Sequence, residues 1–121
     1  MDIAEFDDYC AGFPGSNKVI QWGGAHVWKV DDKVFAIASH WGKATGQDEW
    51  RYVFKVSDIA WEMFRDHPGV VPAPYLGRAK WVQVEDPASV TKEDLRSYIG
   101  ASYQIIARKL TKRRRTELGL I

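Results

Sequence analysis

The hydrophobic and polar positions follow two different periods along the chain, and together these periods predict an α+β domain. Apolar side chains recur every three or four positions, as in amphipathic helices, in residues 2–12, 58–67 and 92–110. Shorter segments have the β-branched and aromatic composition of strands, in residues 18–22, 25–30, 33–39, 50–56 and 80–85. Consecutive strands with short connections favour a mostly antiparallel sheet. We therefore expect two layers, with helices on one face of the sheet, in the order α-β(3–4)-α-β(2)-α.

Each predicted helix begins with a residue that can cap it. Asp2 and Glu5 have the spacing of a capping box, Ser57 precedes the second helix and Thr91 the third. The apolar face predicted for the second helix consists of Ile59, Ala60, Met63 and Phe64.

The segments 25–30 and 33–39 predict a β-hairpin around the two-residue turn Asp31-Asp32, which lacks the glycine that a type I′ turn prefers. A regular register would pair Val30 with Lys33, Trp28 with Phe35 and His26 with Ile37. Trp28, Phe35 and Ile37 would then share one face of the sheet. The pattern leaves open which of the two faces meets the helices.

Residues 67–85 predict an extended, stiff connection between the second helix and the last strand. Proline fixes φ and disfavours helix in the residue before it, so the helix should end near His67. From Lys80 onward, the alternation of apolar and polar residues predicts a half-buried strand. The residues that disfavour a regular helix in this segment are Pro68, Gly69, Pro72, Pro74 and Gly77.

The 121 residues suit a single domain, which we expect to span residues 1–110 and to carry a basic C-terminal tail, residues 111–121. The net charge is +1, but residues 1–70 hold 7 basic and 11 acidic side chains, whereas residues 71–121 hold 10 and 5. A basic cluster attracts phosphate backbones or other acidic surfaces, although a solvated extension that favours solubility has the same composition. The oligomeric state stays open.

The composition argues against an enzyme, a metal protein and a membrane protein. The spacing of His26, His40 and His67 matches no zinc motif, and Cys10 is the single cysteine, so no intramolecular disulfide can form. No nucleophile-elbow or phosphate-loop sequence is present, so we expect no catalytic residue, metal or cofactor. No signal sequence opens the chain, and no apolar run could cross a bilayer. We expect a cytoplasmic protein without a membrane partner.

Binding is better supported than catalysis, because basic side chains are interleaved with aromatic ones. Cations can neutralise phosphates, and rings such as Trp28, Trp50, Tyr52 and Trp81 can stack on bases. The hypothesis of double-stranded DNA binding rests on Lys29, Lys33, Arg51, Lys55, Arg78, Lys80, Arg113, Arg114 and Arg115. Lysines on an exposed sheet face are also ordinary. The alternative is a protein-interaction or chaperone-like module with an aromatic-rich surface, a protein partner and no catalytic activity.

The chain resembles the MmcQ/YjbR family of small bacterial proteins. The resemblance rests on 13–15 (Phe-Pro-Gly), 22–23 (Trp-Gly), 30–36 (Val-Asp-Asp-Lys-Val-Phe-Ala), 54–56 (Phe-Lys-Val), 68–73 (Pro-Gly-Val-Val-Pro-Ala), 80–82 (Lys-Trp-Val) and 102–103 (Ser-Tyr). It implies a fold similar to secretion-chaperone and frataxin-like folds, and DNA binding through hairpin loops that act as a double wing. Lys33, Lys55 and Lys80 match the family's basic positions. Trp22, Phe35, Trp81, Ser102 and Tyr103 match its aromatic and small polar positions. The loop 40–49, with Trp41 and Gly46, and the Arg-rich end depart from the family.

Overall fold

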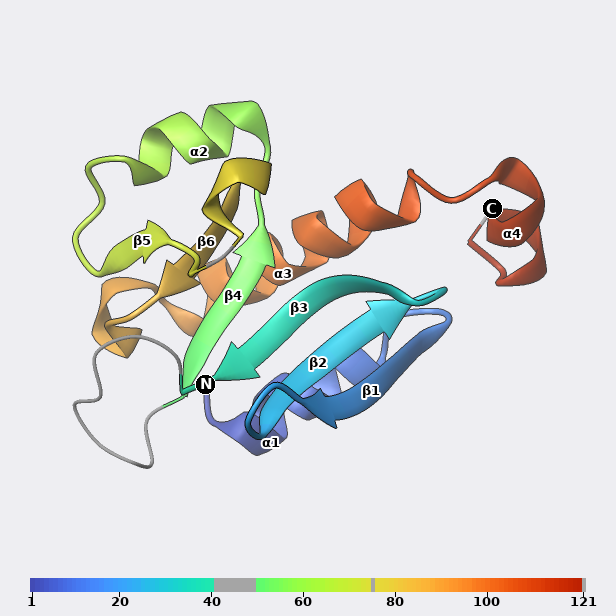
Figure 1. Cartoon of the computed structure of the whole chain (residues 1–121), viewed down its shortest axis with the longest axis horizontal. Helices are drawn as coiled ribbons and strands as arrows, with labels where there is room; N and C mark the ends of the chain where they lie inside the picture. Colours follow the sequence, from blue (N-terminus) through green and yellow to red (C-terminus); the bar gives the residue numbers. More distant parts are fainter. Residues whose placement is uncertain (41–49, 75, 121) are drawn as a thin grey trace.

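The computed structural model describes residues 1–40, 50–74 and 76–120, and it shows a helical layer packed on an antiparallel sheet (Figure 1). Within these residues, six strands pair in the order β1-β2-β3-β4-β6-β5, and every neighbouring pair is antiparallel. The strands are Ser16–Gln21 (β1), Ala25–Val30 (β2), Lys33–Ser39 (β3), Arg51–Lys55 (β4), Val70–Pro72 (β5) and Trp81–Val84 (β6). The helices are Ile3–Ala11 (α1), Asp58–Phe64 (α2), Lys92–Ala107 (α3) and Lys112–Glu117 (α4), with 3-10 turns at Gly77–Ala79 (η1) and Pro87–Ser89 (η2). The predicted fold class is confirmed.

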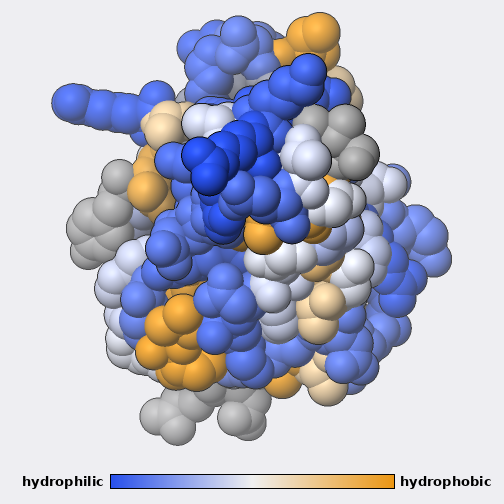
Figure 2. All heavy atoms as spheres, turned by 90° about the vertical axis from the view of Figure 1, so that its right-hand side faces the viewer, coloured by the Kyte–Doolittle hydropathy of each residue, from blue (hydrophilic) through white to orange (hydrophobic). Residues whose placement is uncertain are grey.

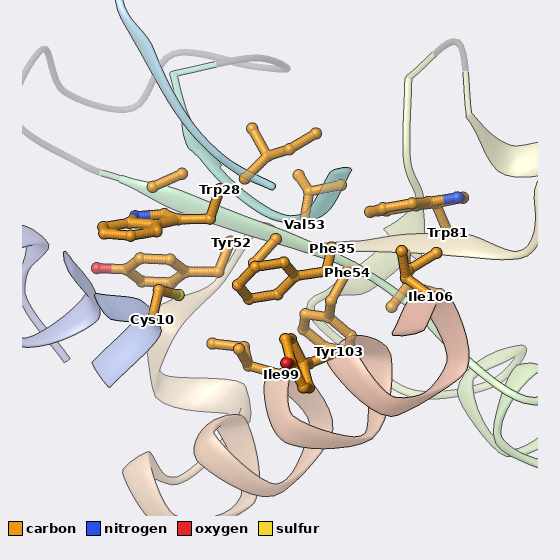
Figure 3. Packing of buried hydrophobic residues seen from close by; sticks show 14 of the residues in the cluster. Cys10, Trp28, Phe35, Tyr52, Val53, Phe54, Trp81, Ile99, Tyr103 and Ile106 are labelled. Atoms are coloured by element: carbon orange, nitrogen blue, oxygen red, sulfur yellow. The ribbon is translucent and has the colours of Figure 1, made fainter. Parts of the chain in front are cut away.

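Helices α1, α2 and α3 pack on the same face of the sheet. Phe6 of α1 lies 5.0 Å, between ring centroids, from Tyr52 of β4, and Tyr98 of α3 stacks on Phe54 of the same strand at 5.7 Å. Phe64 of α2 contacts both Phe54 and Tyr98. Figure 3 shows this layer, with Phe35 of β3 and Phe54 of β4 directed toward α3 and Tyr52 of β4 beside Cys10 of α1.

Ser102 joins α3 to the middle of the sheet through its hydroxyl group. The Oγ donates to the carbonyl of Phe35 at 2.7 Å and accepts from the backbone N–H of Lys55 at 3.0 Å. The side chain is fully buried, so both polar groups of the sheet are satisfied without water. This contact gives the Ser102 of the family pattern a structural role.

The register predicted for the hairpin is wrong beyond the turn. Val30 pairs with Lys33 as expected, but the register shifts at Trp28 and Lys29, so that Trp28 pairs with Ala36. The strand β3 holds one extra residue there, a β-bulge that moves Phe35 out of the pairing. Phe35 instead packs against Tyr103 of α3, with ring centroids 5.1 Å apart.

The turn itself has the expected length, and its two aspartates supply the unusual backbone. Asp31 has a φ of 50° and Asp32 a φ of 64°, both in the left-handed region that a type I′ turn requires. Aspartate tolerates this region better than most residues do, which explains how the turn forms without glycine.

Both faces of the central strands are buried, whereas the sequence predicted a half-buried last strand. The row formed by Trp28, Ala36, Phe54 and Val82 lies on the face that meets the helices. The opposite row, Val27, Ile37, Val53 and Gln83, is also fully buried. All four residues of β6 are buried, so the half-buried assignment of this strand is corrected.

The connection that leads to β6 contains the short strand β5 and depends on Gly69. This glycine has a φ of 82°, and a Cβ atom built on it would lie 2.7 Å from the Cβ of Ser89. Its carbonyl accepts hydrogen bonds from the backbone N–H groups of Glu85 and Asp86, at 2.8 and 3.2 Å. The glycine of the Pro-Gly pair in the family pattern is therefore required by backbone geometry.

The apolar face predicted for α2 is wrong in phase. Ile59 and Met63 are 77% and 63% exposed, while Phe64 is buried and Ala60 and Trp61 are partly buried against the core. A helix of seven residues buries few positions, and here the large ring of Trp61 replaces Met63 in the contact with the core.

Part of the predicted basic tail forms the helix α4, which packs onto the domain. Thr111 caps it by accepting from the N–H of Arg114 at 3.1 Å. Beyond its end, Leu118 packs against Gly15, whose φ is 73° and whose built Cβ would lie 3.3 Å from Leu118. The domain boundary at residue 110 stays a prediction.

Candidate nucleic-acid interface

The pairing of the strands places three basic residues at one end of the sheet. Lys33 begins β3 beside the β2–β3 turn, and Lys55 ends β4 opposite Trp81, which begins β6 directly after Lys80. The C-terminal end of α3 lies here too, since Lys109 acts electrostatically on Lys55. We call this part of the molecule the basic end. It comprises Lys33, Lys55, Arg78, Lys80, Lys109 and the basic residues of α4.

Lys55 lies among like charges in the basic end. Its Nζ donates to the carbonyl of Ala79, so the ammonium group is held close to the 3-10 turn η1. Burial lowers the pKa of Lys55, the positive charges of Lys109 and Lys80 lower it further, and Asp58 partly opposes them. A bound anion would relieve this repulsion, which makes the site electrostatically suited to phosphate.

Lys80 is held in place by an ion pair. Its backbone adopts the left-handed conformation, with a φ of 61° and a ψ of 46°, at the end of η1. Its Nζ lies 2.5 Å from Oδ1 of Asp58, and this hydrogen bond holds the pKa of the Asp58 carboxyl below its usual value. The charge of Lys80 is thus partly neutralised, so it contributes less to an anion site than its position alone suggests.

The arginines of α4 differ in their pairing. Arg114 donates to Asp31 of the β2–β3 turn, with Nη2 2.7 Å from Oδ1, and it also pairs with Glu117. Hydrogen bonds from Arg114 lower the pKa of both carboxyls. Arg113 pairs with Glu117 at 3.0 Å but remains 87% exposed. Arg114 therefore anchors the helix, whereas Arg113 stays available at the surface.

Three exposed lysines form no ion pair with the residues that the structure describes, namely Lys33, Lys109 and Lys112. Residues 108–117 hold six basic side chains and one acidic side chain. Figure 2 looks at the end of the molecule where α4 lies and shows hydrophilic side chains gathered over it. This surface can attract a polyanion.

Comparison with known proteins agrees with the fold and the sequence pattern. The family model YjbR matches residues 11–105. The chain belongs to the YjbR family. No curated protein matches this chain.

Two solved structures have the same fold as this YjbR-family chain. The first is the crystal structure of a Deinococcus radiodurans protein with the domain DUF419. It is 25% identical, with a TM-score of 0.81, over 98% of this chain and 88% of that one. The second, a protein from Pseudomonas syringae, is 20% identical, with a TM-score of 0.68, over 88% and 99%.

Two of the predicted cationic residues are not fully exposed in the structure. Arg51 is only 2% exposed and begins β4, at the opposite end of the strand from Lys55. Lys29 is half-buried and lies in β2, where it pairs with Asn17 and Val34. Burial removes Arg51 from any surface contact, while Lys33, Lys55 and Lys80 lie at one end of the sheet.

Most of the rings expected to stack on bases are buried. Trp28, Tyr52 and Trp81 are 6%, 3% and 7% exposed, so they belong to the core of this YjbR-family fold. The indole Nε1 of Trp28 donates to Asp7 at 2.9 Å, which ties α1 to β2. Among the described tryptophans, Trp22 is well exposed, at 52%, while Trp41 lies outside the described residues, as does Gly46.

Lys109 and Lys112 are the functional candidates that the sequence-based site missed. Both belong to the basic C-terminal segment, but sequence alone does not show that this segment returns to the strand ends. Within the described residues, no group of three or more His, Cys, Asp or Glu side chains could hold a metal. No helix in the same part of the chain is long and apolar enough to cross a membrane.

Proposed function

We propose that this YjbR-family protein binds double-stranded DNA through the phosphate backbone, with the basic end as the contact surface. The observation that carries the proposal is that Lys33 and Lys55 lie at the same end of the sheet, and that Lys109, which leads to Lys112 in α4, acts electrostatically on Lys55. Positive charges brought together by folding are unfavourable for the free protein, and a polyanion offsets their repulsion. Arg113 and Arg78 extend the same surface.

The proposed surface binds mainly the phosphate groups of DNA rather than its bases. Specific reading of bases needs side chains that reach into a groove or rings that stack, and the buried positions of Trp28, Tyr52 and Trp81 do not offer such rings. The tip of the β2–β3 hairpin carries the exposed Asp32, whose charge would be repelled from a groove between phosphates, and Asp31, which is paired with Arg114. The lysines beside the tip, not the tip itself, then make the contact.

The experiment is a fluorescence anisotropy titration of a labelled 20-base-pair duplex at several salt concentrations. A phosphate-dominated complex loses affinity linearly on a log–log plot, with a slope of about −0.9 for each phosphate neutralised. Three to six contacts therefore predict a slope between about −3 and −5. Absence of binding at low salt would contradict the proposal, as would an affinity that does not change with salt.

The exposed apolar side chains of α2 favour a second candidate, a protein-interaction module. Ile59 and Met63 are 77% and 63% exposed, and the same helix contributes Trp61 and Phe64 to the lining of a cavity of about 280 Å³. Affinity capture from nuclease-treated lysate would be compared between the protein and its Ile59→Ser/Met63→Ser variant. A partner that binds the first and not the second supports this candidate, and equal capture by both rejects it.

A further inference from the structure

A second cavity is distinct from the one lined by Trp61 and Phe64. It lies between three parts of the chain, namely the C-terminal end of α3, the turn after α1, and α4. It has a volume of about 300 Å³, within the range of small-molecule sites. It is lined by Phe13, Tyr103, Gln104, Arg108, Arg115 and Leu120, among others. Three segments of the chain thus combine in one pocket, which shares only Arg115 with the basic end.

One wall of this cavity is aromatic. The rings of Phe13 and Tyr103 are stacked, with centroids 4.6 Å apart and planes inclined by 21°. The Tyr103 hydroxyl donates to the carbonyl of Pro14 at 2.6 Å, and burial raises the pKa of this phenol, so it stays neutral. A flat apolar group can pack against this wall.

The polar side of the cavity is cationic. Arg108 and Arg115 both line it, and none of the described residues that line it is acidic. The two guanidinium groups keep their charge at all ordinary pH values, so this side of the cavity is suited to an anionic group.

The end of α4 closes the cavity through a Schellman motif. Gly119 has a φ of 74°, the N–H of Leu120 donates to the carbonyl of Arg115 at 2.8 Å, and the N–H of Gly119 donates to Thr116 at 3.1 Å. This turn directs the chain back, so that Leu120 lines the cavity that Arg115 also lines.

We propose that this cavity binds a small aromatic carboxylate. The carboxylate would accept hydrogen bonds from the Arg115 and Arg108 guanidinium groups, and the ring would lie on the wall formed by Phe13 and Tyr103. A guanidinium recognises a carboxylate through paired hydrogen bonds, which a single ammonium group cannot reproduce.

The test is an NMR titration of the isotope-labelled full chain with benzoate, without DNA. We expect saturable shifts of the Arg115 Nε–H and the Gln104 amide. Acetate, which lacks the ring, and benzyl alcohol, which lacks the charge, should each bind at least about tenfold more weakly than benzoate. Absence of saturable shifts would overturn the proposal, as would equal binding of acetate or benzyl alcohol.

Variants distinguish binding of benzoate in this cavity from general electrostatic attraction to the basic surface. Arg115→Lys keeps the charge but loses the planar donor set, so benzoate should bind about tenfold more weakly. Arg113→Lys, in the same helix but 87% exposed, is the matched control and should bind like the parent. Should Arg115→Lys release α4, Arg108→Gln tests the site from α3 and should also weaken binding. Unchanged affinity in Arg108→Gln would overturn the proposal.

Discussion

Arg114 and Asp31, 83 positions apart in the chain, form a two-point ion pair that joins α4 to the β2–β3 turn. Nη2 lies 2.7 Å and Nε 3.2 Å from Oδ1 of the carboxylate. The pair neutralises one charge of the turn and fixes the helix that contributes Lys112 and Arg113 to the basic end. The surface proposed to meet DNA therefore depends on an acidic residue that does not itself attract phosphate.

This ion pair makes the packing of α4 dependent on pH. The hydrogen bond from Arg114 lowers the pKa of Asp31 in the folded protein, so its stabilising effect is complete above the ordinary aspartate pKa of about 3.9. It is lost as the pH falls through the lower, folded-state pKa. Amide hydrogen exchange of residues 114–118 should quicken in Asp31→Asn at neutral pH, with the melting temperature lowered by no more than about 4 °C. Asp32→Asn is the control, and equal exchange in both variants would argue against this role for Asp31.

Ser102→Ala should destabilise the domain, because it leaves the carbonyl of Phe35 and the N–H of Lys55 without their partner in the core. We expect a loss of about 1–3 kcal/mol in the free energy of unfolding, measured by urea denaturation. The exposed Ser97 of the same helix provides the control, and Ser97→Ala should change stability by less than about 0.5 kcal/mol. Similar values for the two variants would show that the buried hydroxyl contributes little.

Gly69→Ala and Gly23→Ala separate backbone strain from steric overlap. Both glycines have positive φ, 82° and 77°, but a Cβ atom on Gly69 would meet Ser89, whereas none of the described atoms lies within 4 Å of a Cβ on Gly23. Gly23→Ala should cost about 1–2 kcal/mol for the left-handed backbone. Gly69→Ala should cost about 1–3 kcal/mol more for overpacking. Thermal unfolding of both variants gives the comparison, and equal losses would contradict it.

Asp7 connects α1 to strands β1 and β2 through polar contacts. It accepts from Trp28 Nε1 at 2.9 Å and from Lys18 Nζ at 3.1 Å, and it lies 2.9 Å from Nδ1 of His26. Asp7→Ala leaves the buried indole N–H unpaired and should lower the free energy of unfolding by about 1–3 kcal/mol. Asp8 is exposed on the same helix, so Asp8→Ala should be close to neutral, and tryptophan fluorescence during unfolding can measure both.

The sequence predicted α1, α2, α3 and most of the strands in their order, because these depend on local periodicity and turn residues, but it assigned no helix to α4. Asp2, Ser57 and Thr91 cap the three helices as expected, and the turn at Asp31-Asp32 has the expected length. The β-bulge near Trp28 could not be predicted, because the pattern of apolar and polar residues in the two strands does not show that one of them holds an extra, unpaired residue. The prediction of which side of α2 is buried was wrong for a related reason. In so short a helix, the packing of a single large side chain, Trp61, decides which side is buried.

The positions of the candidate residues in the fold follow from the sequence only in part. Lys33, Lys55 and Lys80 share one end of the sheet because antiparallel pairing places them there, and this much follows from strand order. The burial of Arg51 and the partners of Lys80 and Arg114 depend on contacts between distant segments, about which single-sequence patterns carry no information.

The most direct test of the basic end compares the salt dependence of DNA binding in two triple variants. One removes three exposed charges of the basic end, Lys33→Gln/Lys109→Gln/Lys112→Gln. The other removes three charges elsewhere, Arg65→Gln/Lys92→Gln/Arg96→Gln, so the net charge falls equally. In the first variant, the slope of log K against log salt should become less steep by about 0.9 for each lost phosphate contact. In the second, the slope should stay that of the parent. Equal slopes in the two variants would contradict binding at the basic end.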